Sequence, residues 1–437
     1  MDIDLPNQKK HLRYIDLFAG CGGLSEGFEA AGMFRGVAHV EWESAPLQTL
    51  ISRLRDKWRY KDAASRVIQM DIRNSDSLFN GDSEQTFPKH LGLDKLVGPT
   101  MSIDVLIGGP PCQAYSMAGR IRDKNGMQRD YRNFLFESYL RVVARYRPAL
   151  CVFENVPGML SAKPGGIQIL DRIRTGFRAI GYEVPEDFSS CLVQMSEFGL
   201  PQNRSRVILL AVRSDLVKGD GTEFLKTFYS EVLPNQRSLK ARTVGDTIGK
   251  LPPLLPRKKP DTANGLRLSH FLGSAPVNDH IPRFHSLRDQ AIFRELAIDA
   301  QRSSPRFRSV DALRKLYTER TGRNSAVHKY SVLQVNGKSN LIPAHLHKDG
   351  LRHIHFDPKQ ARSITVREAA LLQGFPNDFD FYGAQGHRYK MIGNAVPPIF
   401  AMCLAKAVAF AMETLQNQPT FMKRAKAIPH VQKGQRR

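Results

Sequence analysis

The sequence contains few cysteines, and they lie far apart. Its five cysteines include no Cys-x-x-Cys pair; they are Cys21, Cys112, Cys151, Cys191 and Cys403. This spacing argues against a disulfide framework and against a zinc ribbon. A reducing cytoplasmic environment fits better, and it leaves one of the thiols available as a nucleophile.

Long apolar runs are also absent. No stretch of about 18 consecutive apolar residues occurs, so the sequence predicts no membrane-spanning helix and no membrane partner. The first ten residues are polar and lack the apolar stretch of a signal peptide. We therefore expect a cytoplasmic protein, whose 437 residues, 41% of them hydrophobic, suffice for a large core and a second domain.

Acidic residues are scarce relative to basic ones. The chain has 64 Lys and Arg against 42 Asp and Glu, which gives a net charge of +22. This excess favours a partner with dense negative charge, typically nucleic acid, although a basic protein without such a partner is the alternative. Residues 216–360 carry 25 basic and 13 acidic side chains, so one third of the chain holds more than half of the excess.

The first 215 residues alternate between short apolar runs and helical patterns. The apolar runs predict strands over 13–18, 36–41, 67–70, 103–107, 149–153 and 206–212. Helical periodicity predicts helices over 24–31, 45–55, 133–146 and 168–180. This alternation is typical of an α/β fold with a doubly wound, mostly parallel sheet, in which ligands bind at the carboxyl ends of the strands.

The pattern changes after residue 215. Prolines, glycines and basic residues become frequent, and the strand–helix alternation stops. We interpret this region as a second, smaller basic domain that faces nucleic acid; a loop-rich insertion is the alternative. The basic residues of 417–437, with no acid among them, predict a disordered tail able to contact phosphate.

Regular patterns return near the C-terminus. Thr365 and Glu368 form a capping-box pattern that starts a helix, and Gly374 follows its last turn. A final apolar helix is expected over 399–416, because the two prolines before it suit a helix start.

A glycine-rich loop, Phe18-Ala-Gly-Cys-Gly-Gly-Leu24, follows the first predicted strand. Glycines allow the backbone to approach a ligand closely, but Ser25 in the sixth position excludes the dinucleotide motif Gly-x-Gly-x-x-Gly. At later strand ends, Glu41 can accept from ribose hydroxyls, Trp42 can stack on adenine, and Asp71 can bond its amino group. These residues indicate an adenosine-containing cofactor, either NAD or S-adenosylmethionine; a glycine turn without a ligand is the alternative.

A candidate catalytic residue, Cys112, lies in the segment Gly108-Gly-Pro-Pro-Cys-Gln-Ala-Tyr-Ser116. Its two prolines fix a turn after a predicted strand and hold Cys112 at the sheet edge. A thiol there is either a nucleophile or a small buried side chain. Residues 117–133 carry five basic side chains and two glycines, which is typical of a mobile loop that closes over an anionic substrate.

Two further polar segments flank predicted strands. Glu154 is placed as a general acid or as a partner for a base edge, and Asn155 beside it can fix the turn. Arg204 and Arg206 are two residues apart, so both should face one side of the sheet, where they can bind a base carbonyl or phosphate. The alternatives are that Glu154 is a solvated acid and that Arg204 and Arg206 belong to a surface ion-pair cluster.

Four histidines near the C-terminal third could place pairs of rings on one strand face; they are His345, His347, His353 and His355. No cysteine accompanies them, so we expect solvated or core histidines and no metal site.

Six motifs, in this order, resemble the motif set of the cytosine-5 DNA methyltransferases of bacteria and phages. They are 20–24, Pro110-Pro111-Cys112-Gln113, Glu154-Asn155-Val156, Gln202-x-Arg204-x-Arg206, 362–368 with 373–376, and 393–398. The resemblance extends between residues 12 and 410. Tyr115 and Asn203 depart from the family pattern, and residues 72–102 form a long insertion.

The resemblance implies the S-adenosylmethionine-dependent methyltransferase fold. Its catalytic and cofactor-binding domain would span 12–215, its target-recognition domain and hinge 216–375, and its return to the catalytic domain 376–416. The implied reaction transfers a methyl group from S-adenosylmethionine to carbon 5 of a cytosine flipped out of a specific duplex DNA sequence.

The resemblance also assigns roles to residues. Cys112 would add to carbon 6 of cytosine, Glu154 would hold the ring nitrogen and the amine, and Arg204 and Arg206 would orient the base. The cofactor-binding residues would be Phe18, Gly20, Gly22, Gly23, Leu24, Glu41, Trp42, Asp71, Ile72, Pro111, Leu135, Asn394, Ala395 and Val396. The substrate-binding residues would be Gln113, Ser116, Asn155 and Gln202, whereas Thr365 and Arg367 would be scaffold.

The expected partners are double-stranded DNA and a cognate restriction endonuclease that acts separately. The enzyme itself is expected to be a monomer in the cytoplasm, at the nucleoid. Cytosine-5 methylation of RNA and a catalytically idle DNA-binding relative are the alternatives. A dehydrogenase would leave Cys112 unexplained, and an amino-group methyltransferase would carry an acid or Asn where Gly109 stands.

Overall fold

The computed structural model describes residues 11–82, 90–111, 135–238, 240–263, 265–273, 277–325 and 329–416. These residues form two compact units. The first unit contains the described residues up to 198, residues 205–238 and those from 396 onward. The second unit contains residues 199–204 and the described residues from 240 to 395.

The first unit is built on an eight-stranded sheet. The strands are β1 (Leu12–Leu17), β2 (Phe34–Glu41), β3 (Val67–Gln69), β4 (Val105–Gly108), β5 (Leu150–Asn155), β6 (Tyr182–Glu183), β7 (Leu192–Gln194) and β8 (Ser205–Arg213). Their order is β3-β2-β1-β4-β5-β8-β6, with β7 also paired to β8. The strands β1 to β5 run parallel, whereas β8 is antiparallel to β5.

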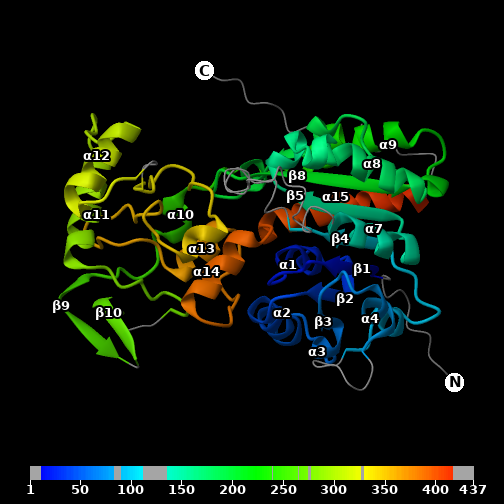
Figure 1. Cartoon of the computed structure of the whole chain (residues 1–437), viewed down its shortest axis with the longest axis horizontal. Helices are drawn as coiled ribbons and strands as arrows, with labels where there is room; N and C mark the ends of the chain where they lie inside the picture. The colour runs from blue at the N-terminus through cyan, green and yellow to red at the C-terminus, as the bar shows by residue number, and fades with distance from the viewer. Residues whose placement is uncertain are drawn as a thin grey trace. The chain divides into compact units, whose positions relative to one another are not determined.

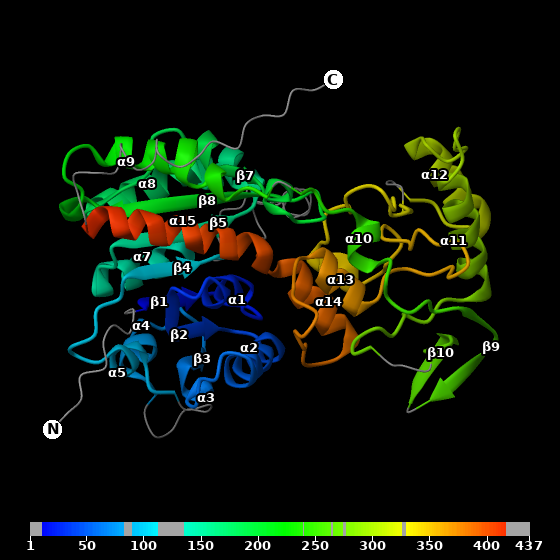
Figure 2. The ribbon, with the colours of Figure 1, turned by 180° about the vertical axis from the view of Figure 1, so that it is seen from behind.

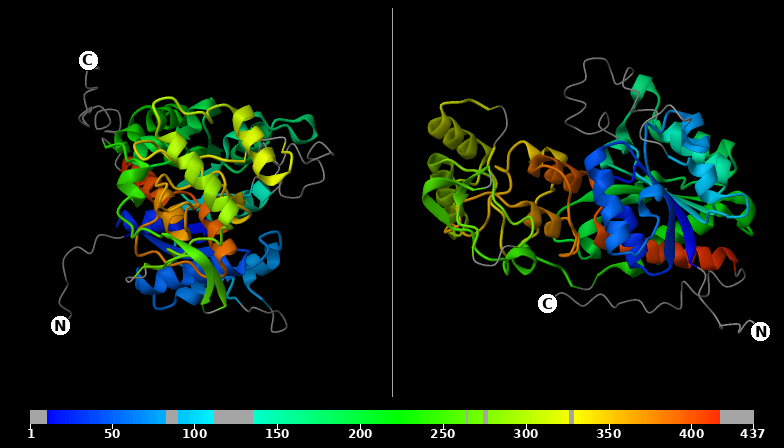
Figure 3. Two further views of the ribbon diagram at one scale, coloured as in Figure 1. Left: turned by 90° about the vertical axis from the view of Figure 1, so that its left-hand side faces the viewer. Right: turned by 90° about the horizontal axis from the view of Figure 1, so that it is seen from below.

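Helices cover both faces of this sheet (Figures 1 to 3). They are α1 (Gly23–Ala30), α2 (Ser44–Asp56), α3 (Ala63–Arg66), α4 (Ser75–Asn80), α5 (Leu93–Val97), α7 (Leu135–Tyr146), α8 (Ile169–Ala179), α9 (Gly221–Thr227) and α15 (Pro398–Gln416). Side chains of α7 and α8 share one hydrophobic core with Ile15 and Leu17 of β1. On the other face, α1 packs on β1 through the Tyr14 and Phe28 rings, and α15 packs on α1.

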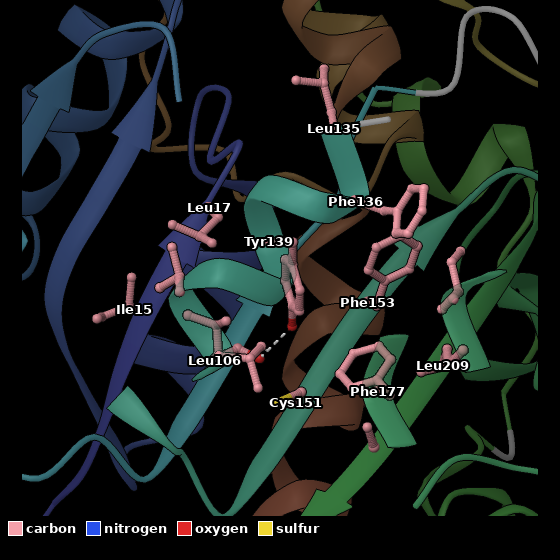
Figure 4. Close-up of a cluster of buried hydrophobic side chains, with 14 of the residues drawn as sticks. Ile15, Leu17, Leu106, Leu135, Phe136, Tyr139, Cys151, Phe153, Phe177 and Leu209 are labelled. Carbon is pink, nitrogen blue, oxygen red and sulfur yellow. Dashed lines mark hydrogen bonds between the residues drawn. The ribbon is translucent and has the colours of Figure 1, made fainter. Parts of the chain in front are cut away.

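Tyr139 of α7 ties the core to two central strands (Figure 4). Its hydroxyl lies 3.0 Å from the carbonyl oxygens of Leu106 in β4 and Val152 in β5. Its ring packs edge-on against Phe153 and Phe177, at centroid distances of 5.3 and 6.3 Å. A fully buried hydroxyl therefore satisfies strand carbonyls and fixes α7 over the two strands that lead to the candidate site.

The second unit combines short helices with a two-stranded ribbon. Its elements are α10 (Val244–Ile248), β9 (Pro256–Ala263), β10 (Leu266–His270), α11 (Leu287–Ala300), α12 (Val310–Thr321), α13 (Val366–Leu372) and α14 (Gln385–Asn394). A small core joins α11 to α12 and includes Phe293, Leu316 and Tyr330. The predicted capping box of Thr365 and Glu368 is confirmed, and Gly374 follows α13 with φ +84°.

The predicted α/β fold with a mostly parallel sheet is confirmed. The six predicted strands correspond to β1 to β5 and β8, and the helices predicted over 24–31, 45–55 and 168–180 correspond to α1, α2 and α8. The helix predicted over 133–146 is described from Leu135. The short strands β6 and β7, the helices α3 to α5, α9 to α12 and α14, and the ribbon of β9 and β10 were not predicted.

Local contacts explain the limits of the two compact units. The first unit extends to residue 238, because the Tyr229 hydroxyl bonds to the backbone of Ile208 and Leu210 in β8 at 2.7 Å. The second unit extends to Ala395, because α14 packs on the turn Ala344–His347. There, a Cβ on Gly393 would lie 2.3 Å from the Pro343 backbone, so only glycine allows this approach. The functional domain limits drawn from the resemblance stay predictions.

The span from Gln385 to Gln416, which includes α14 and α15, is long and apolar enough to cross a membrane. However, 67% of its apolar window is buried inside the protein, as in a core helix.

Candidate active site

The candidate residues of the first unit gather at one edge of the sheet. The carboxyl ends of the parallel strands lead to the loop 18–22, Glu41, Asp71, Gly109 and Glu154. Arg206 joins them because β8 runs antiparallel to β5 and begins at this edge. β1 and β4 are neighbours in the sheet, although they are not consecutive in the sequence, so the strand order switches between them. Open α/β sheets bind ligands at such a switch point.

The loop after β1 has an unusual backbone. Phe18, Gly20 and Gly22 have φ values of 59°, 58° and 86°, in the left-handed region. A non-glycine residue such as Phe18 is strained there, and such strain is common at ligand sites. A Cβ built on Gly20 would meet no atom within 4 Å, so the loop backbone faces open space at this point.

Glu41 holds this loop to the end of β2. Its carboxylate accepts the Gly20 N–H at 2.8 Å and the Glu43 N–H at 2.7 Å, one on each oxygen. Burial raises the pKa of the Glu41 carboxyl. Each oxygen can accept a further hydrogen bond. The Trp42 side chain beside it is 60% exposed, so its indole face is open to a planar ring.

Asp71 and Ile72 follow β3. The Asp71 carboxylate accepts from Arg73 Nε at 2.8 Å, and this hydrogen bond lowers the pKa of Asp71. Ile72 is only 5% exposed. Together, the loop backbone, the Glu41 carboxylate and the exposed indole match the hydroxyl, amine and ring groups of an adenosine-containing molecule, so the residues fit the expected cofactor.

Glu154 and Arg206 form an ion pair at the ends of β5 and β8. Arg206 Nε lies 3.0 Å from Glu154 Oε1, and the two side chains are 11% and 13% exposed, respectively. Gly109 leaves space for this carboxylate, because a Cβ there would lie 2.8 Å from Glu154 Oε2. The pair therefore lies directly beside the turn that leads to Cys112.

Asn155 connects this turn to β5. Its Nδ2 donates to the Pro110 carbonyl at 3.3 Å, and its Oδ1 accepts the Val156 N–H at 2.9 Å. Its side chain is buried. The sequence-based interpretation that Asn155 fixes a turn is consistent with these bonds.

Three predicted site residues lie outside the described residues. Pro111 is the last described residue of its segment, and the chain is described again from Leu135. Cys112, Gln113 and Ser116 fall between them, together with the basic loop 117–133.

Gln202 and Arg204 belong to the second unit. Arg204 is 1% exposed, and its guanidinium donates to the carbonyls of Ile342, Gly393 and Ala395 at 3.1–3.2 Å. The Gln202 amide is likewise fully buried and bonds to Ile342 and Gln373. Arg204 precedes β8, so it does not share a sheet face with Arg206 in the way the spacing predicted. A contact between Arg204 and a base stays a prediction.

The remaining predicted residues are distributed over both units. Asn394 and Ala395 end α14 in the second unit, whereas Val396 belongs to the first unit. Leu135 begins α7 and is 7% exposed. Arg367 donates to the carbonyls of Asn278, Asn377 and Phe379, as expected of a scaffold residue.

A buried polar network beneath the cofactor loop was not predicted. Ser25 Oγ donates to Asp16 at 2.6 Å and lies 3.0 Å from His39 Nδ1. Burial raises the pKa of Asp16 to about 7 and lowers that of His39 to about 3. The signal in the sequence was an acid inside an apolar strand, Tyr14-Ile-Asp-Leu17.

The four C-terminal histidines differ in burial. His353 and His355 are buried, whereas the rings of His345 and His347 stack near the surface at 6.4 Å. Across the described ranges of the chain, no group of three or more His, Cys, Asp or Glu side chains has the arrangement of a metal site.

Comparisons with known proteins agree with this geometry. The pattern of the C-5 cytosine-specific DNA methylase family matches residues 12–409. The Type II methyltransferase M.Bpa9945I of Bacillus paralicheniformis is 31% identical, over 90% of this chain and 98% of its own. The Type II methyltransferase M1.HphI of Haemophilus parahaemolyticus is 30% identical, over 91% and 86%, respectively.

Solved structures share the fold. A putative DNA modification methyltransferase encoded within an Escherichia coli prophage has a TM-score of 0.61, at 24% identity over 92% of this chain and 99% of its own. The Dnmt2 methyltransferase of Schizosaccharomyces pombe has a TM-score of 0.51, at 16% identity over 93% and 100%. The family match over nearly the whole chain, together with these relatives, confirms the resemblance: the chain belongs to the C-5 cytosine-specific DNA methylase family and is a DNA cytosine-5 methyltransferase.

Proposed function

We propose that this chain is the modification enzyme of a restriction-modification system, and that it methylates one cytosine within a specific duplex DNA sequence through a covalent Cys112 adduct. The observation that carries the proposal is the arrangement of Gly109, Glu154 and Arg206 at the turn that precedes Cys112. The Type II names of the relatives support the restriction-modification context.

The reaction begins with the attack of Cys112 on the cytosine ring. Carbon 5 of cytosine is a poor nucleophile until a group adds at carbon 6. The Cys112 thiolate forms a bond to carbon 6, and the ring electrons move toward N3. Glu154 holds a proton at N3 and accepts from the exocyclic amine, which stabilises the resulting enamine. Because the ring must be reached from its face, the cytosine is flipped out of the duplex.

Carbon 5 then takes the methyl group that S-adenosylmethionine supplies. Water takes the proton from carbon 5, whose electron pair re-forms the double bond between carbons 5 and 6, and the bond between sulfur and carbon 6 breaks to release Cys112 as a thiolate. Arg206 orients Glu154 through their ion pair, so it is a positioning residue in this proposal. Arg204, with its three backbone acceptors, positions the segment before β8.

The cofactor would be held at the sheet edge of the first unit. Glu41 and Trp42 would contact the ribose and the adenine, and Asp71 and Ile72 would complete the adenine site. The glycine-rich loop would lie against the rest of S-adenosylmethionine through Phe18, Gly20, Gly22, Gly23 and Leu24. The remaining cofactor-binding residues would be Pro111, Leu135, Asn394, Ala395 and Val396. The second unit would be the target-recognition domain.

Bisulfite sequencing tests the reaction. Purified protein is incubated with S-adenosylmethionine and either unmethylated genomic DNA or unmethylated tRNA, and protected cytosines are mapped. We expect protection within one short sequence motif. If cytosines in tRNA are protected instead, the substrate is RNA; if neither is protected while the cofactor still binds, the chain is an inactive DNA-binding relative.

Cys112→Ser tests the covalent step. We expect methylation to fall below detection, because a hydroxyl is a far weaker nucleophile than a thiolate at neutral pH. Cofactor binding and DNA binding should remain, as measured by calorimetry and fluorescence anisotropy. Cys403→Ser is the matched control and should retain activity, because that half-buried thiol lies on α15. Methylation at the wild-type rate by Cys112→Ser would contradict the assignment.

A further inference from the structure

The ribbon formed by β9 and β10, residues 256–270, presents basic side chains without acidic partners. It contains four basic residues against one acid, Asp261. Arg257 pairs with that acid at 3.2 Å. Lys258, Lys259 and Arg267 are exposed, and none of them forms an ion pair with an acid in the described part of the chain. Three positive charges of the ribbon therefore face solvent.

A large bulge displays the two lysines. Leu268 pairs with Asp261, and His270 pairs with Pro256, so the four residues between Pro256 and Asp261 lie opposite Ser269 alone. Extra residues on one strand bend and twist a ribbon and re-aim its side chains. Lys258 and Lys259 lie on this bulge, away from the regular pairing.

The base of the ribbon is held firmly by the second unit. Ser269 Oγ accepts the His285 N–H at 3.0 Å, and His270 Nε2 lies 2.8 Å from the Gln360 carbonyl. The side chains of Ser269 and His270 are both buried. Farther out, the Arg267 guanidinium lies 4.0 Å from the centre of the Phe284 ring, which orients it. A ribbon fixed at its base positions its charges before any partner binds.

The helices α11 and α12 of the same unit provide a contrast. Residues 287–321 contain eight basic and five acidic side chains, but many of these charges pair. Arg306 and Arg320 both contact Glu295, at 2.6 and 2.7 Å. The ribbon and α12 lie at opposite ends of the unit (Figures 1 and 2). Within the described ranges, six of those eight basic side chains thus pair with acids, whereas three of the four in the ribbon do not.

We propose that this ribbon is the surface through which the second unit binds duplex DNA, with Lys258, Lys259 and Arg267 on phosphates and the two strands along the major groove. A two-stranded ribbon fits a groove about 12 Å wide, and unpaired cations release counterions when they meet phosphate. The inference rests on the proposed DNA-methylating function and identifies the element that holds the substrate.

The salt dependence of DNA binding tests this surface. The probe is a mixed-sequence DNA duplex of about 30 base pairs, with anisotropy measured from about 50 to 200 mM salt. The slope of log K against log salt is negative, and each phosphate contact increases its magnitude by about 0.9. Changes in slope below refer to this magnitude. The full-length double variant Lys258→Gln/Lys259→Gln should therefore lower the slope by about 1.8. The matched control, Arg306→Gln/Arg320→Gln, removes the same charge and should change the slope by less than about 0.5.

A gain-of-charge variant gives an independent readout if the double variant unfolds. Thr262 is exposed on β9, opposite Arg267, so Thr262→Lys should raise the slope by about 0.9. An unchanged slope in either ribbon variant would overturn the inference. So would an equal loss in the control, or a loss confined to an RNA duplex. Cytosine protection by the wild-type protein is measured in parallel by bisulfite sequencing. A wild-type protein that protects cytosines while the ribbon variants keep their salt slope would overturn the ribbon proposal alone; absence of protection would overturn the proposed methylation.

Discussion

Two carboxylate–guanidinium pairs in this protein differ in their surroundings. Glu154 and Arg206 meet at the sheet edge of the first unit, where one contact of 3.0 Å joins two side chains that keep 13% and 11% exposure. Glu368 and Arg362 meet inside the second unit, through two contacts of 2.6 and 2.7 Å, and their side chains are 0% and 1% exposed. The first pair keeps some exposure to solvent and is called the open pair below; the second is fully buried and is called the closed pair.

The hydrogen bonds of the closed pair explain its role. Glu368 also accepts the Thr365 N–H at 2.7 Å and so completes the capping box of α13. Burial opposes the charge of Glu368, but Arg362 holds the pKa of its carboxyl well below the usual range. A buried pair of this kind stabilises one arrangement of the chain, whereas a pair at a strand end can exchange partners with a substrate. Burial therefore distinguishes the structural pair from the catalytic candidate.

The largest effect should come from the open pair. Glu154→Gln removes the group that holds the proton at N3, so we expect kcat to fall about 10²- to 10⁴-fold. The thermal unfolding midpoint should change little, because glutamine has the same shape. Glu186→Gln, a surface carboxylate in the same unit with 69% side-chain exposure, is the control and should keep wild-type activity. Activity within about tenfold of wild type for Glu154→Gln would remove Glu154 from the proposed chemistry.

The closed pair should show the opposite behaviour. Glu368→Gln leaves Arg362 buried without its counter-charge, and breaking such a pair costs about 3–5 kcal/mol of unfolding free energy. Urea unfolding, followed by hydrogen exchange of the amides in α13, measures this loss. Glu319→Gln on α12, where the side chain is 58% exposed, should cost less than about 1 kcal/mol. Equal losses in the two variants would show that the closed pair contributes no more than a surface pair.

Acidification should affect the stability of the two units differently. Burial lowers the pKa of several histidines of the second unit, to about 3 in His285 and to about 4 in His270, His353 and His355. These values lie below the ordinary 6.5, so the unfolded chain binds protons that the native unit does not. Stability should therefore be full above about pH 6.5 and fall as the pH drops toward 4, by up to about 1.4 kcal/mol per pH unit for each histidine.

Hydrogen exchange at several pH values tests this response. Among the described residues of the first unit, burial lowers the pKa of His39 and His90. We therefore expect amides of α13 to lose protection at a higher pH than amides of β5. Loss of protection in β5 first, or at the same pH, would show that these buried histidines do not set the acid stability of the second unit.

The sheet and most of its edge were predictable because their signals are local. Apolar runs mark the strands, and Glu41, Gly109 and Glu154 directly follow or end them, so the fold brings them to one edge. The environment of Arg204 was not predictable, because it bonds to Ile342, 138 residues away. Its spacing from Arg206 predicted a shared face, whereas the unit boundary separates the two. The unpaired charges of the ribbon were not predictable either, because composition does not reveal which basic side chains form ion pairs.

Covalent trapping tests the central claim most directly, that the sheet edge beside Cys112 performs cytosine chemistry. The target cytosine of a cognate duplex carries fluorine at carbon 5, which blocks the final elimination because fluorine does not leave as a cation. With S-adenosylmethionine present, wild-type protein should form a denaturation-resistant complex with this DNA, and Cys112→Ser should form none. An active wild-type enzyme that gives no such complex, or a complex that persists in Cys112→Ser, would contradict the account.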